Sequence, residues 1–176
     1  MMSRAQDWAW VQQDCFTSQG MVSVCERLPT HLECFQDSCY QLFYARFYDW
    51  QTEDKCNATG GGHVLEINSA EERDFVKGFL NTAPPRRKRL GEFPLTSVWL
   101  GATDSAVEGE FRWLSDNSEI DFQDWARGQP ANIASNRMSQ DCVALDLFQD
   151  WRWDDVSCHN TNALVCEIKN VNGSSG

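Results

Sequence analysis

The sequence contains no long hydrophobic run and only three histidines. No stretch of roughly eighteen apolar residues occurs among its 176 residues, so no membrane-spanning helix is expected. The histidines, His31, His63 and His159, are scattered along the chain. A hydrolase would need a Ser-His-Asp set or paired carboxylates in an apolar cleft, and the sequence suggests neither. We therefore expect a protein that is not an enzyme.

Basic residues are also scarce. Lys and Arg number 15 against 26 Asp and Glu, which gives a formal net charge of −11. A general nucleic-acid-binding role is excluded because phosphate contacts need a basic face. Disorder is excluded as well, since hydrophobic residues make up 41% of the chain and eight residues are tryptophan. The length fits one domain with a short appendage.

Cysteine, in contrast, is abundant, with eight residues. Zinc sites usually show cysteines about two to four residues apart, or Cys and His interleaved, whereas the closest pair here, Cys34 and Cys39, is wider. Disulfides are therefore favoured, and they indicate an oxidising compartment, so we expect a secreted, extracellular protein. The polar start of the sequence leads into no apolar segment, and we expect a signal peptide to be missing from it.

The local patterns predict an α+β fold with a mostly antiparallel sheet. A capping box, Ser69 with Glu72, predicts a helix that begins at Ser69 and ends before Pro84. Residues 115–140 are polar and rich in turn formers, and a stretch this long without periodicity usually has a function. The other predicted elements are a helix over 47–56 and strands over 39–44, 63–67, 97–101, 111–114, 142–145 and 163–168.

A dozen short motifs occur in an order that resembles the C-type lectin-like domains. Each motif is weak alone, but their common register is specific, and the resemblance covers about residues 34 to 168. The motifs are Cys39-Tyr40, Trp50 with Cys56, Leu65 with Ile67, Glu71-Glu72 with Phe75, Val98-Trp99-Leu100-Gly101, Gly109 with Phe111 and Trp113, Trp125, Gly128-Gln129-Pro130, Asp141-Cys142-Val143, Trp153-Asp154-Asp155 with Cys158, and Val165-Cys166-Glu167.

The resemblance implies a C-type lectin-like fold: two helices, mostly antiparallel sheets and a long polar loop region, braced by disulfides. We expect an N-terminal cysteine-containing extension over 1–33, the domain over 34–169, and a flexible tail over 170–176 that resembles a vector-derived sequence. The proline of the Gln129-Pro130 pair is expected to be cis, as it often is in the family.

Two disulfides are implied by the resemblance, Cys56–Cys166 and Cys142–Cys158. Family members with an N-terminal extension place a further cysteine about eleven residues before the Cys-Tyr pair, but that position is Leu28 here. Our first expectation for the remaining four cysteines is Cys25–Cys39 with Cys15–Cys34. An intermolecular bridge from Cys15, and hence a homodimer, stays open as an alternative.

The resemblance also implies two calcium sites, because calcium takes oxygen ligands from carboxylates, carbonyls and amides. Asp104, Glu108 and Asp141 match an accessory site, and Asn132 is a candidate fourth ligand. The alternative is that Asp104 and Glu108 are solvated turn residues in an acidic protein.

The principal site in the family binds calcium and two vicinal sugar hydroxyls. The matching residues here are Gln129, Gln140, Asp154 and Asp155. Ala131 replaces a ligand with a side chain that has no oxygen, so we expect Asn132 to contribute instead, with Asn136 as a further candidate because the loop is longer than usual.

These residues imply a carbohydrate-binding protein that recognises glycan hydroxyls through calcium. The Gln at position 129 leans toward the galactose-type motif, although Ala131 breaks that motif. The alternative is a domain that keeps the fold and binds a protein partner without calcium-dependent sugar binding.

Three further features have a structural and a functional interpretation. Asn57-Ala58-Thr59 is an N-glycosylation sequon, although such sequons are often unused. The basic run over 86–89 could be a processing site or a patch for sulfated glycans, but a solvated loop is favoured. Of Trp151 and Trp153, one could stack on a sugar, but Trp153 is expected in the core.

Overall fold

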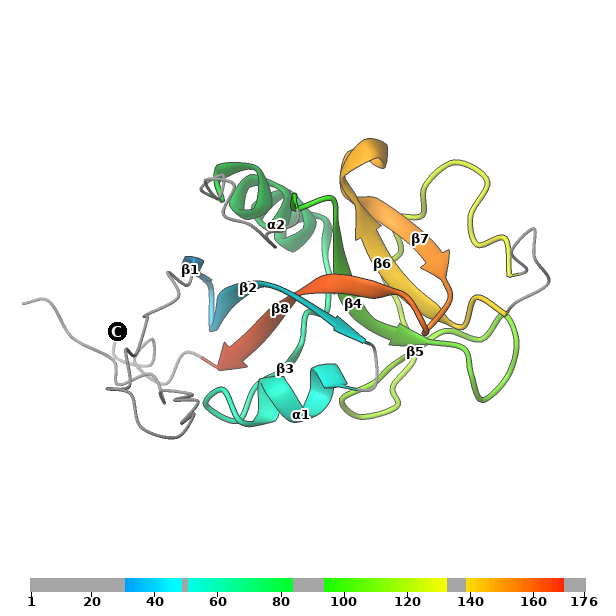
Figure 1. Ribbon diagram of the computed structural model, residues 1–176, viewed down its shortest axis with the longest axis horizontal. Coiled ribbons are helices and arrows are strands. Elements are labelled where there is room, and N and C mark those ends of the chain that lie inside the picture. Colours follow the sequence, from blue (N-terminus) through cyan, green and yellow to red (C-terminus); the bar gives the residue numbers. More distant parts are fainter. Residues whose placement is uncertain (1–30, 49–50, 84–93, 133–138, 170–176) are drawn as a thin grey trace, which may run out of the picture.

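The computed structural model describes residues 31–48, 51–83, 94–132 and 139–169 (Figure 1). Several expectations lie outside these ranges: the N-terminal extension with Cys15 and Cys25, the basic run over 86–89, Asn136, and the tail. Within them, no helix is long and apolar enough to cross a membrane.

Eight strands, two α-helices and a short 3-10 turn make up the described part of the chain. The predicted α+β class is confirmed. In chain order the elements are β1 (His31–Phe35), β2 (Ser38–Tyr48), α1 (Thr52–Asn57), β3 (His63–Val64), α2 (Ala70–Thr82), β4 (Ser97–Thr103), β5 (Arg112–Trp113), β6 (Cys142–Asp146), η2 (Leu147–Gln149), β7 (Arg152–Val156) and β8 (Thr161–Lys169).

The strands form a sheet in the order β1-β2-β8-β4-β6-β7, with β3 paired to β8 and β5 paired to β4 (Figure 1). The first and last long strands, β2 and β8, are antiparallel neighbours. All other pairings are antiparallel too, except the short parallel contact of β4 with β8 at Val98 and Ala163. The polar region between β5 and β6 therefore emerges from the β4-β6-β7 side of the sheet.

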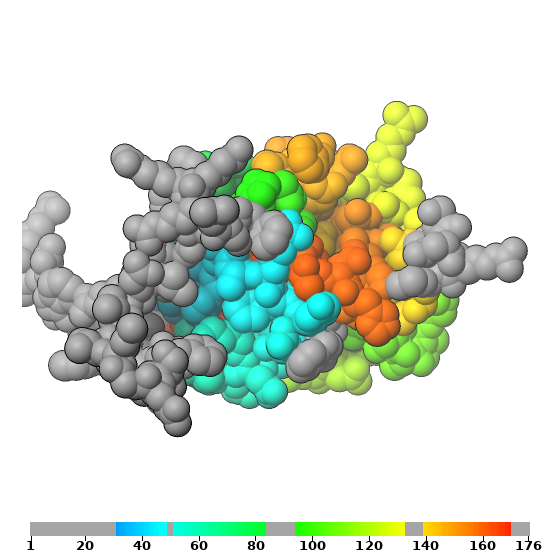
Figure 2. Space-filling model, viewed as in Figure 1, coloured from blue at the N-terminus to red at the C-terminus, as the bar shows by residue number. Residues whose placement is uncertain are grey.

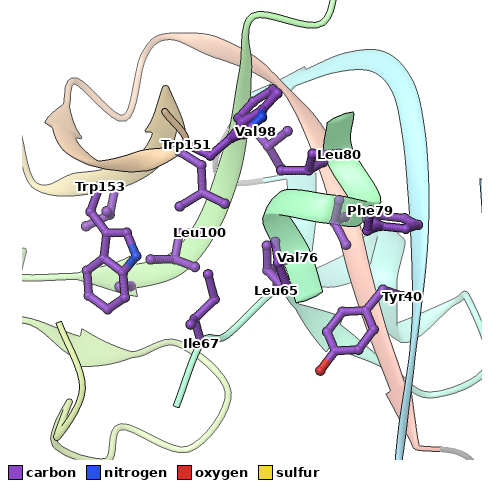
Figure 3. Packing of buried hydrophobic residues seen from close by; sticks show 14 of the residues in the cluster. Tyr40, Leu65, Ile67, Val76, Phe79, Leu80, Val98, Leu100, Trp151 and Trp153 are labelled. Carbon is purple, nitrogen blue, oxygen red and sulfur yellow. The ribbon is translucent and has the colours of Figure 1, made fainter. Parts of the chain in front are cut away.

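Helix α2 begins as the capping box predicts. The Ser69 hydroxyl oxygen accepts a hydrogen bond from the Glu72 N–H at 3.1 Å. This bond satisfies one of the N–H groups that the first turn of a helix leaves free. The buried apolar side chains of α2 are Val76, Phe79 and Leu80, and they pack on the sheet (Figure 3).

The helix predicted over residues 47–56 is wrong in its first half. Strand β2 continues to Tyr48, and α1 covers only Thr52–Asn57. After a bulge between Phe43 and Phe47, the end of β2 pairs again with β8, at Asn162 and Thr161. Ladder hydrogen bonds to a strand more than a hundred residues away thus override a local sequence that is compatible with a helix.

One of the two core clusters lies between α2 and the sheet. Leu65, Ile67, Leu100 and Trp153 belong to the same buried cluster as the apolar residues of α2 (Figure 3). Trp153 is fully buried, as predicted, and Trp151 is 2% exposed, so both tryptophans are part of the core. The ring of Trp153 packs edge-on against three aromatic rings, those of Trp113, Phe122 and Trp125.

Three disulfides brace the described residues. Cys56–Cys166 and Cys142–Cys158 are confirmed. The expected Cys25–Cys39 and Cys15–Cys34 pairs are wrong, because Cys34 is bonded to Cys39. Strands β1 and β2 form a hairpin closed by Gln36 and Asp37, and the register places Cys34 directly opposite Cys39, with the two Cα atoms 3.9 Å apart.

We predict that the hairpin disulfide contributes least to stability. It closes a loop of only 5 residues, which the chain-entropy model converts to about 2 kcal/mol. The double variant Cys34→Ala/Cys39→Ala should therefore lose about 2 kcal/mol in a urea titration. A loss above about 4 kcal/mol would show that the hairpin stabilises the domain through contacts the loop length does not capture.

Candidate functional site

Strand β7 carries the two acidic residues of the expected principal site. Asp155 follows Trp153 by two residues and therefore lies on the same face of the strand. Both side chains are fully buried. The polar region runs alongside this strand: Ala126 N–H donates to the Trp153 carbonyl at 2.8 Å, and Trp153 N–H donates to the Asp124 carbonyl at 3.0 Å. This pairing brings the residues that follow Ala126 close to Asp154 and Asp155.

The chain then turns sharply at the Gln129-Pro130 pair. The Gln129 N–H donates to the Ala126 carbonyl at 3.0 Å, and Gly128 adopts a φ of 89°, a backbone conformation that favours glycine. The bond between Gln129 and Pro130 is cis, which confirms the expectation from the resemblance. The turn places the Gln129 side chain over β7.

Hydrogen bonds gather all five residues expected at the principal site. Gln129 Nε2 donates to Asp154 Oδ1 at 2.5 Å. The Asp155 carboxylate accepts from the backbone N–H of Ala131 at 2.9 Å and from that of Asn132. Gln140 Nε2 donates to the Asp155 backbone carbonyl at 2.5 Å. We call this set, Gln129, Asn132, Gln140, Asp154 and Asp155, the loop site.

The expected accessory residues lie next to the loop site. Asp104 is 3% exposed, and its Oδ2 accepts the Gly109 N–H at 2.8 Å. A Cβ on Gly109 would stand 4.0 Å from Nδ2 of Asn132, so this turn borders the loop site. Asp141 is joined to the turn through its backbone carbonyl, which accepts the Thr103 hydroxyl at 2.5 Å.

These carboxylates interact electrostatically with one another. Burial, followed by the charges of Asp141 and Asp155, raises the pKa of Asp104. Loss of hydration and the charges of Asp104 and Asp141 raise the pKa of the exposed Glu108 carboxyl. The negative charge of several carboxylates is thus concentrated at one end of the molecule, where a cation would relieve their repulsion.

Three buried oxygen atoms in this region accept no hydrogen bond from the residues that the structure describes. They are Oδ1 of Asp104, Oε1 of Gln129 and Oδ1 of Asn132. A buried acceptor without a partner costs about 1–3 kcal/mol. Carboxylate and amide oxygens are the ligands that a hard cation such as calcium takes, so the residues fit such an ion. The described residues hold no group of three His, Cys, Asp or Glu placed to bind a metal, so a cation would need the amide oxygens as well.

Sequence reasoning found the side chains but missed two groups that hold them. The sequence draws attention to Ala131 only because its side chain has no oxygen, whereas its backbone N–H donates to the Asp155 carboxylate. The Ser139 hydroxyl, which donates to Asp141 Oδ2 at 3.0 Å, was also missed. No sequence signal reveals a backbone donor, because every residue except proline carries one.

Asp154 gives a pH prediction for the metal-free protein. Burial, then the charges of Asp155 and Asp146, raises the pKa of Asp154 to about 6. Because the folded-state pKa lies above the unfolded value, the stability linked to the protonated carboxyl is present at low pH and is lost as the pH rises through about 6. Thermal melts in chelator should show a lower melting temperature at pH 7.5 than at roughly pH 5.

The variant Asp154→Asn should flatten this part of the pH dependence, since an amide does not titrate. Asp121→Asn, at an exposed position in the same polar region, is the matched control and should keep the profile of the parent protein. If Asp154→Asn leaves the difference between the two pH values unchanged, Asp154 is not its source.

Comparison with known proteins identifies the family to which this fold belongs. Residues 46–168 match the family model described as the Lectin C-type domain, which is more than half of the chain. The chain belongs to the C-type lectin domain family. This family is generally non-enzymatic, and its domains commonly bind calcium.

Individual C-type lectin domains are similar over most of their length. An alpha-N-acetylgalactosamine-specific lectin from Patiria pectinifera is 32% identical over 144 residues, which covers 78% of either chain. C-type lectin domain family 4 member E of Homo sapiens is 28% identical and covers 93% of this chain and 68% of its own. The mouse scavenger receptor C-type lectin carbohydrate-recognition domain superposes with a TM-score of 0.66 at 30% identity, covering 82% of this chain and 99% of its own.

Proposed function

We propose that this C-type lectin domain is part of an extracellular carbohydrate-binding protein that holds calcium at the loop site and binds glycan hydroxyls there. The observation that carries the proposal is the set of three unpartnered buried oxygens, on Asp104, Gln129 and Asn132, beside several carboxylates. Lectin relatives support carbohydrate binding in general, and one of them is named for alpha-N-acetylgalactosamine.

The residues divide into donors and acceptors for a sugar. Calcium would be held by Gln129, Asn132, Asp154 and Asp155, and it would supply a direct ligand bond to sugar hydroxyls. A second ion beside Asp104, Glu108 and Asp141 would need amide or carbonyl oxygens as well, because these three carboxylates are not placed to bind a metal by themselves. An ionised carboxylate such as Asp154 only accepts hydrogen bonds, whereas the Gln129 amide both donates and accepts. Their side-by-side placement selects hydroxyls of a particular geometry, and Gln129 favours a galactose-type sugar.

Gln140 has a different part in this arrangement. Its Nε2 is bonded to the Asp155 backbone carbonyl, so the Gln140 side chain ties the start of β6 to β7. A neutral amide at this position also leaves one negative charge fewer for a cation. We infer a calcium affinity at the weak end of extracellular sites, with a dissociation constant of about 10⁻³ M.

A second candidate function is binding of a protein partner without calcium. It is favoured by the bonding of Asp155, whose carboxylate already accepts the N–H groups of Ala131 and Asn132. These bonds hold the loop without an ion. The surface formed by the polar region and β7, toward the right of Figure 2, would then serve as a docking surface for that partner.

Calcium and glycan measurements separate the two functions. At 10 mM calcium and a dissociation constant of about 10⁻³ M, mass action should stabilise the fold by about 1.4 kcal/mol. Thermal melts with calcium or chelator measure this shift. A glycan array should show binding to galactose-type glycans that is abolished by chelator.

The variant Gln129→Ala should lose both the calcium shift and glycan binding. Gln149→Ala is its matched control, because Gln149 is an exposed glutamine in η2, at the other end of the β6–β7 hairpin, and it should behave as the parent protein. Glycan binding that persists unchanged in chelator contradicts the calcium mechanism. No shift and no glycan binding at 10 mM calcium favours the protein-binding function.

A further inference from the structure

The sequon Asn57-Ala58-Thr59 lies at the end of α1. We propose that Asn57 is N-glycosylated when the chain passes through a secretory pathway, so that the protein carries a glycan on a surface other than the loop site. This inference goes beyond the proposed sugar-binding function. It rests only on the extracellular location proposed above.

The Asn57 side chain is accessible in the folded domain. Asn57 and Ala58 are exposed, whereas the preceding Cys56 is fully buried. The Asn57 backbone carbonyl accepts the Gly61 N–H at 3.0 Å, so the backbone is satisfied within the turn. Among the residues that the structure describes, the Asn57 amide group makes no hydrogen bond that a glycan would break.

The position of α1 leaves room for a glycan away from the loop site. Helix α1 packs against β3 and β8, while the loop site is built on β7. Strands β4 and β6 lie between β8 and β7 in the sheet. In Figure 1, α1 forms the lower edge of the molecule and the long polar loops lie toward the right. A glycan on Asn57 would therefore not cover the loop site.

Folding fixes the backbone of the sequon in a helical turn, although the Asn57 side chain stays exposed. We therefore expect the sugar to be transferred before folding is complete. In the folded domain the Thr59 hydroxyl donates to the Lys55 carbonyl at 2.8 Å, which holds the sequon in a helical turn. The disulfide that anchors Cys56 needs Cys166, which follows 110 residues later. At a synthesis rate of about 5–20 residues per second, the sequon stays free for on the order of 5–20 s.

The same delay applies to β8, against which α1 packs, because it is the last strand of the domain to be made. A disulfide adjacent to a sequon can hinder modification when both cysteines are made early. Here the order of synthesis removes that obstacle.

The proposed step is a glycosyl transfer to nitrogen. The co-substrate is a lipid-linked oligosaccharyl pyrophosphate, and a transferase of the host catalyses the reaction. A bond forms between Asn57 Nδ2 and the anomeric carbon, while the bond from that carbon to the pyrophosphate oxygen breaks. The lipid pyrophosphate leaves with the electron pair, and the amide nitrogen gives up one proton to a base. No oxidation or reduction occurs.

Translation of the full chain in the presence of microsomes tests the proposal. An added cleavable signal sequence ensures entry into the lumen, so the result does not depend on how this protein is secreted in nature. The background variant Asn172→Gln removes the second sequon, Asn172-Gly173-Ser174. We expect the protease-protected chain to show an upward mobility shift that peptide N-glycosidase removes.

Three variants assign the shift. Asn57→Gln and Thr59→Ala should each abolish it completely, while Thr59→Ser, which keeps the hydroxyl of the sequon, should retain it. A protease-protected parent chain without the shift overturns the proposal, and so does a shift that persists in Asn57→Gln. Because the readout is the mass of the protein, it is independent of whether the loop site binds calcium or sugar.

Discussion

Replacing Asp155 with alanine should destabilise the metal-free domain by about 2–4 kcal/mol and remove its response to calcium. The backbone N–H groups of Ala131 and Asn132 both donate to the Asp155 carboxylate, which is fully buried. Hydrogen bonds to a charged acceptor contribute about 1.5–3 kcal/mol each. Loss of both is partly offset because the repulsion between Asp155 and Asp154 disappears.

Urea titrations in chelator measure the first effect, and thermal melts with added calcium measure the second. Asp121→Ala is the matched control, because this exposed aspartate changes the net charge equally without touching the loop site. A variant Asp155→Ala that is as stable as the parent would show that the loop is not anchored by this carboxylate. A calcium shift that survives the substitution would place the ion elsewhere.

Removing the Cys56–Cys166 disulfide should have the largest effect on stability of any change considered. It closes a loop of 110 residues, and the chain-entropy model gives about 5 kcal/mol for that length. Since small domains are stable by only about 5–15 kcal/mol, the double variant Cys56→Ala/Cys166→Ala should be close to unfolded at 37 °C.

Circular dichroism in the near ultraviolet, where the buried tryptophans report on tertiary packing, follows the loss of the fold. The hairpin variant Cys34→Ala/Cys39→Ala is the internal control, as it also removes one disulfide but should stay folded. If both double variants lose the same free energy of unfolding, the length of the closed loop does not determine how much each disulfide contributes to stability.

The parts of the fold that depend on local signals could be predicted from the sequence. The capping box predicts the start of α2, and short apolar runs indicate the strands around Val98 and Val165. The two disulfides that tie distant segments came from the family resemblance. Spacing alone could not give them, since eight cysteines can pair in many ways.

The errors arose where a distant or unexpected partner decides the structure. Phe47 and Tyr48 extend β2 because β8 offers them a ladder, and nothing near them in the sequence shows this. The expected Cys15–Cys34 pair is wrong because Cys34 and Cys39 flank a tight hairpin over Gln36 and Asp37, which the sequence pattern does not reveal. In that hairpin the two nearest cysteines are cross-strand partners.

At the loop site the residue types were predictable and their connections were not. The resemblance pointed to Gln129, Asp154 and Asp155. That the Gln129 amide would donate to Asp154, and that a residue without a polar side chain would anchor Asp155, depend on backbone geometry set by the turn at Gly128 and Pro130.

The pairing of β2 with β8 has a consequence for assembly. Ser38 lies opposite Lys169, so the start of β2 and the end of β8 lie side by side at one end of the sheet, while β8 begins at Thr161, shortly after Asp154 and Asp155. Copies joined by a tether at that end of the sheet would leave the loop site of each copy uncovered. Binding of one copy to a clustered ligand then raises the effective concentration of the next, so that weak individual sites can give firm attachment through avidity.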